Sequence, residues 1–217
     1  MRRAIARRMV ESKQSAPHFY TEIEIPMDRA VEYVDSAAAN AGVARTTVTA
    51  VLARACAVAL GSHPSLNALW TEDGLLQMQD VNLGIAIALE DGLVAPALLA
   101  ADKLSLSATG EALRDLVART QNGKLRPSEI SDGTFTLSNL GRHDVSRFSA
   151  IIVPPQVGIL ATGATLERPV VVDGQIVIGK VMTATLSADH RAVDGAYAAT
   201  FLEAFKALLT DPERLDD

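Results

Sequence analysis

Apolar and polar residues follow two different periods along this chain, and together they predict a mixed α/β fold. Over residues 19–25 apolar and polar side chains alternate, which predicts a strand with one solvent-facing side. Residues 2–14 instead place Ile5 and Met9 about one helical turn apart, which predicts a helix that ends before Pro17. The chain therefore opens with a helix followed by a half-buried strand.

The same patterns continue to the other end of the chain. Further helices are expected from Asp28 as N-cap to about Asn40 with Gly42 ending it, from Thr46 as N-cap to about Leu60, over 105–120 and over 196–209. Further strands are expected over 81–89, 93–99, 133–137, 157–164 and 177–186. Asp73-Gly74 and Asp173-Gly174, each between apolar residues, predict tight hairpin turns.

Strands mixed with helices and several hairpins predict an α/β sandwich, in which helices cover a partly antiparallel sheet. No internal repeat, low-complexity run or linker interrupts the pattern. We therefore expect residues 1–217 to form one domain, without a lipoyl or subunit-binding domain. With 48% hydrophobic residues the chain has enough apolar side chains for a large core.

Composition narrows the class of protein. No run approaches the roughly 18 apolar residues of a membrane helix, and the start lacks the features of a secretory signal, so we expect a soluble protein. The single cysteine, Cys56, lies in an apolar helical pattern and is interpreted as core packing in a reducing compartment. A net charge of −6 gives no support for nucleic-acid binding. The basic cluster of Arg2, Arg3, Arg7 and Arg8 is interpreted as a solvated helix face or a set of inter-subunit ion pairs.

The segment 186–195 carries the clearest candidate chemistry. His190 follows the buried strand 177–186 and precedes Asp194-Gly195 and the last helix, so it lies at a corner between two rigid elements. Histidine exchanges protons near neutral pH, which makes a positioned one a candidate general base. A surface histidine in a loop is the alternative interpretation.

Several motifs, taken in order along nearly the whole chain, resemble the catalytic domain of the dihydrolipoamide acyltransferases, the core subunits of 2-oxo acid dehydrogenase complexes. They are Arg2-Arg3-Ala4-Ile5-Ala6-Arg7-Arg8-Met9, Pro17-His18-Phe19, Asp91-Gly92-Leu93-Val94-Ala95-Pro96, Gly133-Thr134-Phe135-Thr136-Leu137-Ser138-Asn139-Leu140-Gly141, residues 148–156 and Asp189-His190-Arg191-Ala192-Val193-Asp194-Gly195. The resemblance implies the fold of chloramphenicol acetyltransferase, with the active site in a channel between subunits of a homotrimer. It also implies coenzyme A as substrate, a lipoyl domain as acyl carrier, and the decarboxylase and dihydrolipoamide dehydrogenase components as partners, with no metal.

The resemblance also assigns roles to three residues. His190 would take the proton of the coenzyme A thiol, and Ser138, near the end of strand 133–137, would stabilise the oxyanion. Asp194 would brace the catalytic loop, with an amino-terminal arginine as partner. The alternative for Ser138 is a hydroxyl that bonds the local turn. His63 and His143 are interpreted as structural or surface residues, and His18 as packing or lining the channel.

Three alternatives remain at this stage. Ser138 with His190 suggests a serine hydrolase, although no Gly-x-Ser-x-Gly motif surrounds Ser138. A non-catalytic scaffold subunit is the second, and retention of both residues argues against it. The third concerns the acyl group: residues 138–141 and 148–156 favour the acetyl branch over the branched-chain and succinyl branches, while Arg142-His143-Asp144 departs from the family pattern beside Ser138.

The resemblance also gives expectations for the source of the lipoyl group, the oligomeric assembly and the cellular compartment. Asp102-Lys103-Leu104 is the nearest match to a lipoylation site, and a surface lysine is favoured there, so the lipoyl group is expected in trans or from a missing amino-terminal domain. Only Leu215 near the carboxyl end could anchor a cage contact, so trimers are favoured over a cubic or dodecahedral cage. The expected compartment is the bacterial cytoplasm, or the mitochondrial matrix if the source is eukaryotic.

Overall fold

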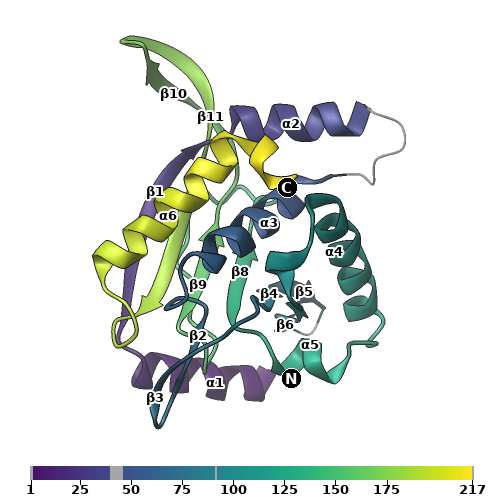
Figure 1. Cartoon of the computed structure of the whole chain (residues 1–217), viewed down its shortest axis with the longest axis vertical. Helices are drawn as coiled ribbons and strands as arrows, with labels where there is room; N and C mark the ends of the chain where they lie inside the picture. Colours follow the sequence, from purple (N-terminus) through teal and green to yellow (C-terminus); the bar gives the residue numbers. More distant parts are fainter. Residues whose placement is uncertain (1, 40–45, 91, 217) are drawn as a thin grey trace.

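The computed structural model describes residues 2–39, 46–90 and 92–216, and it confirms a mixed α/β fold (Figure 1). The main sheet has seven strands in the order β1-β11-β9-β8-β4-β7, with β10 paired to β11. β8 runs parallel to both β4 and β9, whereas the other pairs in this sheet are antiparallel. The predicted partly antiparallel sheet is therefore present.

The helices are α1 (Arg2–Ser15), α2 (Asp28–Ala39), α3 (Val48–Gly61), α4 (Leu106–Gln121), α5 (Pro127–Ser131) and α6 (Gly195–Thr210), with 3-10 turns η1 (Ala101–Lys103) and η2 (Pro212–Leu215). The strands are β1 (His18–Pro26), β2 (Ala68–Thr71), β3 (Gly74–Gln77), β4 (Leu83–Ile85), β5 (Ile87–Leu89), β6 (Gly92–Val94), β7 (Ala97–Leu98), β8 (Phe135–Asn139), β9 (Gly158–Thr162), β10 (Leu166–Val172) and β11 (Gln175–Asp189). The pairs β2-β3 and β5-β6 form two small sheets of their own.

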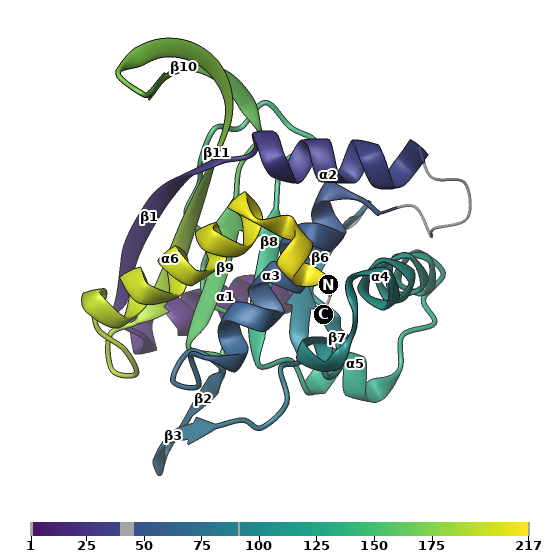
Figure 2. The ribbon, with the colours of Figure 1, turned by 45° about the horizontal axis from the view of Figure 1, so that its top comes forward.

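Two different layers cover the main sheet. α3 and α6 lie across one face (Figures 1 and 2), and their buried side chains, among them Phe201 and Phe205, pack with Phe135 of β8 in the apolar core. The segment 142–157 packs on the other side: Thr136 of β8 donates to the side chain of Gln156 at 2.6 Å, and Ala164, just after β9, donates to the carbonyl of Val145 at 2.8 Å. On this second side the sheet presents polar side chains such as Thr136.

Helix starts differ slightly from the sequence prediction. The N-cap of α3 is Thr47 and not Thr46, because it is the Thr47 hydroxyl that accepts a hydrogen bond from the amide of Ala50 at 3.2 Å. Asp28 is the first residue of α2 rather than its cap, and its carboxylate accepts from the amide of Lys180 in β11 instead. The predicted stop at Asn40 and Gly42 lies outside the described residues.

The two long strands predicted over 81–89 and 93–99 are wrong as continuous elements. Pro96 has no amide hydrogen to give to a sheet, and it separates β6 from β7. Its carbonyl instead accepts from the amide of Ile85, the last residue of β4. The residues after this point, in β5 and β6, leave the main sheet and pair with each other. The short helix α5, with Pro127 at its first turn, was also not predicted.

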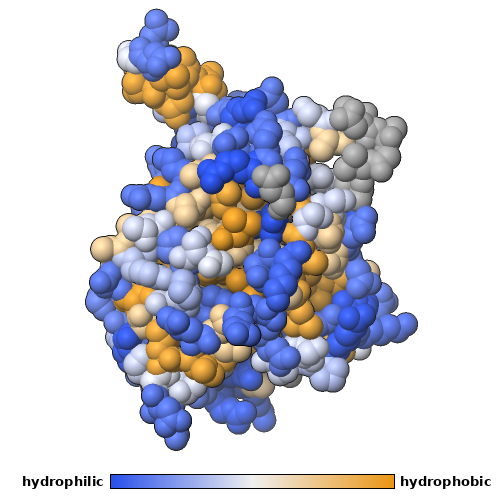
Figure 3. Space-filling view, viewed as in Figure 1, coloured by the Kyte–Doolittle hydropathy of each residue, from blue (hydrophilic) through white to orange (hydrophobic). Residues whose placement is uncertain are grey.

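The hairpin of β10 and β11 projects from the body of the molecule, at the upper left of Figure 1. Its turn has Asp173 and Gly174 at φ of 51° and 77°, the left-handed values that the Asp-Gly pair predicted. The strands beside this turn are apolar yet solvent-facing, and Figure 3 shows orange side chains on the projection below its blue tip. The exposed side chains are Val171, Val172, Ile176, Val177 and Ile178. An apolar arm of this kind marks an interaction surface.

Three sequence interpretations of single residues can be compared with the structure. Cys56 is fully buried, and burial raises the pKa of its thiol, so it packs in the core. Leu215 is buried in the core of its own chain. Lys103 is an exposed surface lysine that pairs with Asp80. In the described ranges no helix is long and apolar enough to cross a membrane.

We expect Glu129→Gln to destabilise the fold in a pH-dependent way. Arg119 donates to the buried Glu129 carboxylate at 2.5 and 2.7 Å, and this holds the pKa of Glu129 below its usual range. A carboxyl with a lowered folded pKa stabilises the fold above its unfolded pKa of about 4.3 and loses that contribution as pH falls through the folded value. Urea unfolding should show a loss of about 1–3 kcal/mol at pH 7 that shrinks below about pH 4.

The matched control is Glu32→Gln, which removes a carboxylate from an exposed pair with Arg29 on α2. Exposed pairs contribute little, so its expected effect is below about 1 kcal/mol at either pH. Equal destabilisation by Glu129→Gln at both pH values would contradict a charge-dependent role for that residue.

Candidate active site

His190 lies in the short turn between β11 and α6, where the sequence places it. Its amide donates to the carbonyl of Pro17 at 3.0 Å, and its ring contacts the ring of Phe19 at 4.8 Å between centroids. The residue is exposed, and within the described part of the chain neither ring nitrogen has a hydrogen-bond partner. The backbone of His190 is therefore fixed while its nitrogens remain available to a substrate.

The residues on either side of His190 form an ion pair. Arg191 donates to the Asp189 carboxylate through Nε at 3.0 Å and through Nη2 at 2.6 Å, and its backbone amide adds a third bond at 3.0 Å. Asp189 is 1% exposed, and its side chain is the buried end of the pair. The guanidinium of Arg191 also lies 4.4 Å from the ring centre of Trp70 in β2. Hydrogen bonding to Asp189 raises the pKa of Arg191.

Ser138 lies inside β8 and not after its end, because the strand continues to Asn139. Thr136, two residues earlier, bonds Gln156 at 2.6 Å on the face covered by the segment 142–157. Side chains two residues apart in a strand share a face, so Ser138 points to this same polar side. It is half-buried, and in the described ranges its hydroxyl has no partner, unlike a serine that bonds a local turn.

Within one chain Ser138 and His190 do not meet. Ser138 pairs with Ala161 of β9, which in turn pairs with Thr185 of β11, so Ser138 lies level with Thr185. His190, the first residue after β11, is five residues beyond Thr185, about 16 Å at strand spacing, and β11 lies two strands to the side of β8, about 10 Å. The two backbone positions are thus about 19 Å apart within one chain, too far for both side chains to reach the same reacting atom.

Asp194 has a clear local role. Its carboxylate accepts from the amide of Tyr197 at 2.9 Å and caps the amino terminus of α6. Among the described residues it makes no ion pair with an arginine, and Arg2, Arg3, Arg7 and Arg8 lie on an exposed face of α1. The expected pairing of Asp194 with one of these arginines stays a prediction.

The other three histidines differ from His190. His63 is buried against Tyr197 and Phe201, and its Nδ1 bonds the carbonyl of Ala59 at 2.7 Å. His18 uses both nitrogens, Nδ1 with the carbonyl of Ala16 at 2.8 Å and Nε2 with the amide of Ile152 at 3.2 Å. In this arrangement Nε2 accepts from the amide of Ile152 and Nδ1 donates to the carbonyl of Ala16. His143 is exposed in a polar turn. His190 is thus the histidine with free nitrogens in a fixed corner.

Comparison with known proteins first defines the class of fold. Chloramphenicol acetyltransferase superposes with a TM-score of 0.64 at 13% identity, covering 94% of each chain. At that identity the likeness shows the fold alone, an α/β sandwich. The particular family follows from the sequence. Residues 1–216 match the model of the 2-oxoacid dehydrogenases acyltransferase (catalytic domain) family, and the chain belongs to it.

Individual relatives agree with this assignment. The chain is 40% identical over 214 residues to the dihydrolipoyllysine-residue acetyltransferase component of the pyruvate dehydrogenase complex from Zymomonas mobilis, covering 98% of this chain and 49% of the relative. The corresponding component from Rickettsia felis is 38% identical, with 98% and 52% covered. The chain thus spans about half the length of the curated relatives that it matches.

This chain matches two solved structures over most of their length. A probable dihydrolipoamide acetyltransferase from Listeria monocytogenes superposes with a TM-score of 0.90 at 34% identity, covering 97% of this chain and 91% of that one. The dihydrolipoamide acetyltransferase of Azotobacter vinelandii gives a TM-score of 0.91 at 27% identity, with 98% and 89% covered. The fold predicted from the sequence motifs is confirmed.

Sequence reasoning missed three residues at the corner: Asp189, Arg191 and Trp70. The first two were visible as opposite charges immediately before and after His190. Trp70 gave no such signal, because its contact with Arg191 joins segments more than a hundred residues apart in the chain.

Proposed function

We propose that this chain transfers an acyl group between a dihydrolipoyl thiol and coenzyme A, as the catalytic core of a 2-oxo acid dehydrogenase complex. The observation that carries the proposal is a spacing. The Azotobacter structure was determined to study a serine, a histidine and an asparagine in catalysis, and the histidine follows the serine by 52 residues and precedes the asparagine by four. Ser138, His190 and Asp194 have the same separations of 52 and four residues. The last position differs, with a carboxylate in place of an amide.

His190 acts as the general base in this scheme. A free thiol has a pKa of about 8.5, so little thiolate is present at neutral pH. An exposed imidazole without partners of its own can take the thiol proton of coenzyme A as sulfur attacks the thioester carbonyl. A new carbon–sulfur bond forms, the bond to the dihydrolipoyl sulfur breaks, and the proton passes from His190 to the departing sulfur. No other reactant is needed.

Ser138 stabilises the charge that develops during this attack. The tetrahedral intermediate carries negative charge on the former carbonyl oxygen, and a hydroxyl aimed at that oxygen donates to it. Because the hydroxyl of Ser138 makes no bond to another described residue, it can serve the intermediate without first giving up a protein partner. Asp194 acts indirectly, by fixing the start of α6 next to the catalytic turn.

The proposed active unit is a homotrimer with the site between subunits. Two observations support it: Ser138 and His190 lie far apart within one chain, and the β10-β11 arm exposes apolar side chains that a second copy can cover. Trimers are favoured over a closed cage, since Leu215 already packs in its own chain. All 217 residues are assigned to one catalytic domain.

Substrate, partners and compartment are proposed from the relatives. The first relatives are named as acetyltransferases of the pyruvate dehydrogenase complex, which supports acetyl as the acyl group over branched-chain or succinyl groups. The partners are then a lipoyl domain, supplied in trans or by another region, and the decarboxylase and dihydrolipoamide dehydrogenase components. Bacterial relatives support the cytoplasm, and an Arabidopsis relative named as mitochondrial supports the matrix for a eukaryotic source.

The test is to measure acyl transfer to coenzyme A from acetyl-, isobutyryl- and succinyl-dihydrolipoamide. Faster transfer of acetyl than of the other two groups supports the proposal. Free acid formed without coenzyme A would indicate a hydrolase, and no turnover with any donor would indicate a scaffold. Preference for isobutyryl or succinyl would reassign the acyl group and keep the reaction.

Charging the projecting arm is expected to disassemble the protein. Ile176 and Ile178 are 79% and 77% exposed, and burying two carboxylates in their place would be costly in any interface that covers them. The double variant Ile176→Asp/Ile178→Asp should therefore elute as a monomer without transfer activity. Ile130→Asp on α5 is the control, because it adds one carboxylate at an apolar side chain that is 67% exposed. A trimeric, active double variant would contradict a role for the arm.

A further inference from the structure

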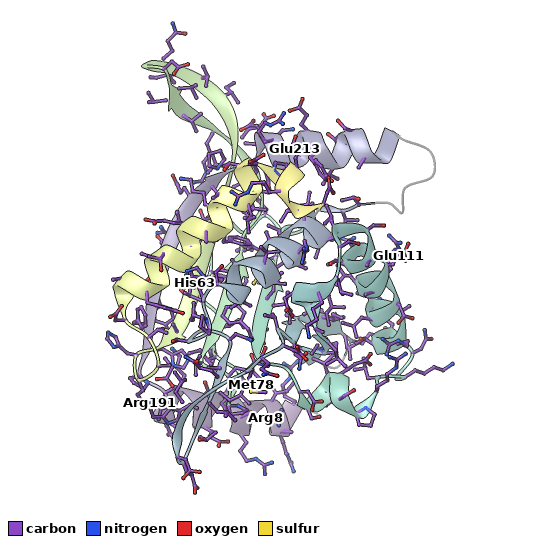
Figure 4. All side chains as sticks on the ribbon, viewed as in Figure 1. Arg8, His63, Met78, Glu111, Arg191 and Glu213 are labelled. Carbon is purple, nitrogen blue, oxygen red and sulfur yellow. The ribbon has the colours of Figure 1, made fainter. Side chains whose placement is uncertain are left out.

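We infer that the Asp189–Arg191 ion pair, stacked on Trp70, is a positioning element that holds His190 in its catalytic orientation. This inference rests on the proposed function, since it assigns the residues that orient the base of that reaction. None of the three residues is placed against the substrate. Asp189 and Arg191 act through the backbone on both sides of His190, and Trp70 acts through Arg191 (Figure 4 labels Arg191 at this turn).

The Asp189 carboxylate is the fixed point of the element. Asp189 is the last residue of β11 and pairs with His18 of β1. Its backbone amide donates a hydrogen bond to the carbonyl of Val157 at 2.9 Å. At 1% exposure a carboxylate needs partners, and Arg191 supplies them through its backbone amide and its guanidinium. Removing the Arg191 guanidinium would leave most of this buried negative charge without a counter-ion.

The guanidinium of Arg191 joins this fixed point to a second segment of the chain. It donates to Asp189 through two nitrogens and lies over the Trp70 ring, and a lysine ammonium lacks the planar fork that makes both contacts at once. Trp70 is itself anchored, because its amide donates to the carbonyl of Pro155 at 2.8 Å. The turn is thus tied to β2 and to the segment 142–157.

In the chain, His190 lies between the two residues of the ion pair, Asp189 and Arg191. Asp189 and Arg191 are both fixed. The hydrogen bond from the His190 amide to the carbonyl of Pro17 and the ring contact with Phe19 then determine where the His190 ring points. The side chain has no hydrogen bond of its own to hold it in the described chain, so its orientation depends on these neighbours. A displacement of about 1 Å at a reacting group can cost about 100-fold in rate.

The decisive experiment compares Arg191→Lys with the wild type. Lysine keeps the charge but loses the bidentate bond and the stacking, so kcat for acyl transfer should fall by about 10- to 100-fold with little change in either KM. Protein labelled with ¹³C in its four histidines gives a direct readout. The signal assigned to His190 by its loss in His190→Gln should shift or broaden, while those of His63 and His143 stay in place.

Two further variants make the test specific. Trp70→Phe keeps an aromatic face and should retain most of the activity, whereas Trp70→Leu should behave like Arg191→Lys. Arg29→Lys, which changes the same residue type in exposed pairs with Glu32 and Glu213, is the control and should be silent. An unchanged His190 signal in Arg191→Lys would overturn the inference. If the wild type transfers no acyl group, the proposed function fails, and the His190 signal alone decides whether the element orients the ring.

Discussion

Replacing His190 with alanine should lower acyl transfer by about 10² to 10⁴-fold, the contribution expected of a general base. The physical reason is that the other three histidines are either bonded through their rings or far from this corner, so none can replace it. The fold should be unaffected, since the ring is exposed and accepts or donates no hydrogen bond to another described residue. Initial rates with acetyl-dihydrolipoamide and coenzyme A measure the effect.

His143→Ala is the matched control, because it removes another exposed histidine from a turn on the same chain. Its turnover should equal that of the wild type. Thermal unfolding of both variants separates lost chemistry from lost structure. Near-normal turnover in His190→Ala would contradict the proposed mechanism.

Most elements of the fold could be predicted from local patterns, because the period of apolar residues indicates which side of an element is buried. Strand 19–25 alternates as predicted, with Glu22 and Glu24 exposed and Ile25 buried. The Asp173-Gly174 turn also formed as predicted, since few residue pairs tolerate two left-handed positions. The strands over 81–99 failed for a different reason. Their apolar runs do not show that β5 and β6 pair with each other outside the main sheet, or that the strand is interrupted at Pro96 between β6 and β7.

For the site, the sequence could identify the residues better than their arrangement. His190 and Asp194 were recognised from a motif, and the corner and the cap of α6 follow from neighbouring residues. The separation of Ser138 from His190 depends on sheet register, which joins β8, β9 and β11 across the chain. The stacking of Arg191 on Trp70 likewise depends on tertiary packing. Local patterns contain no information on such pairings.

Mixing two inactive variants should restore activity. If each site takes His190 from one subunit and Ser138 from its neighbour, a trimer containing both His190→Ala and Ser138→Ala chains has one intact pair. In a ring of three with both variants present, only one junction joins an intact histidine to an intact serine, whichever variant is in excess. Mixed trimers should therefore show about one third of the wild-type rate. Each variant alone should be reduced by about 10² or more.

The measurement uses co-expressed variants with different affinity tags, purified on both tags in turn so that only mixed oligomers remain. Wild-type chains with the same two tags set the full rate, and a chain carrying both substitutions mixed with itself sets the background. Sites confined to one chain would give no recovery above either parent variant. That result would contradict the shared site. Recovery is expected because the sheet register holds Ser138 and His190 about 19 Å apart in each subunit, so that each site needs two subunits.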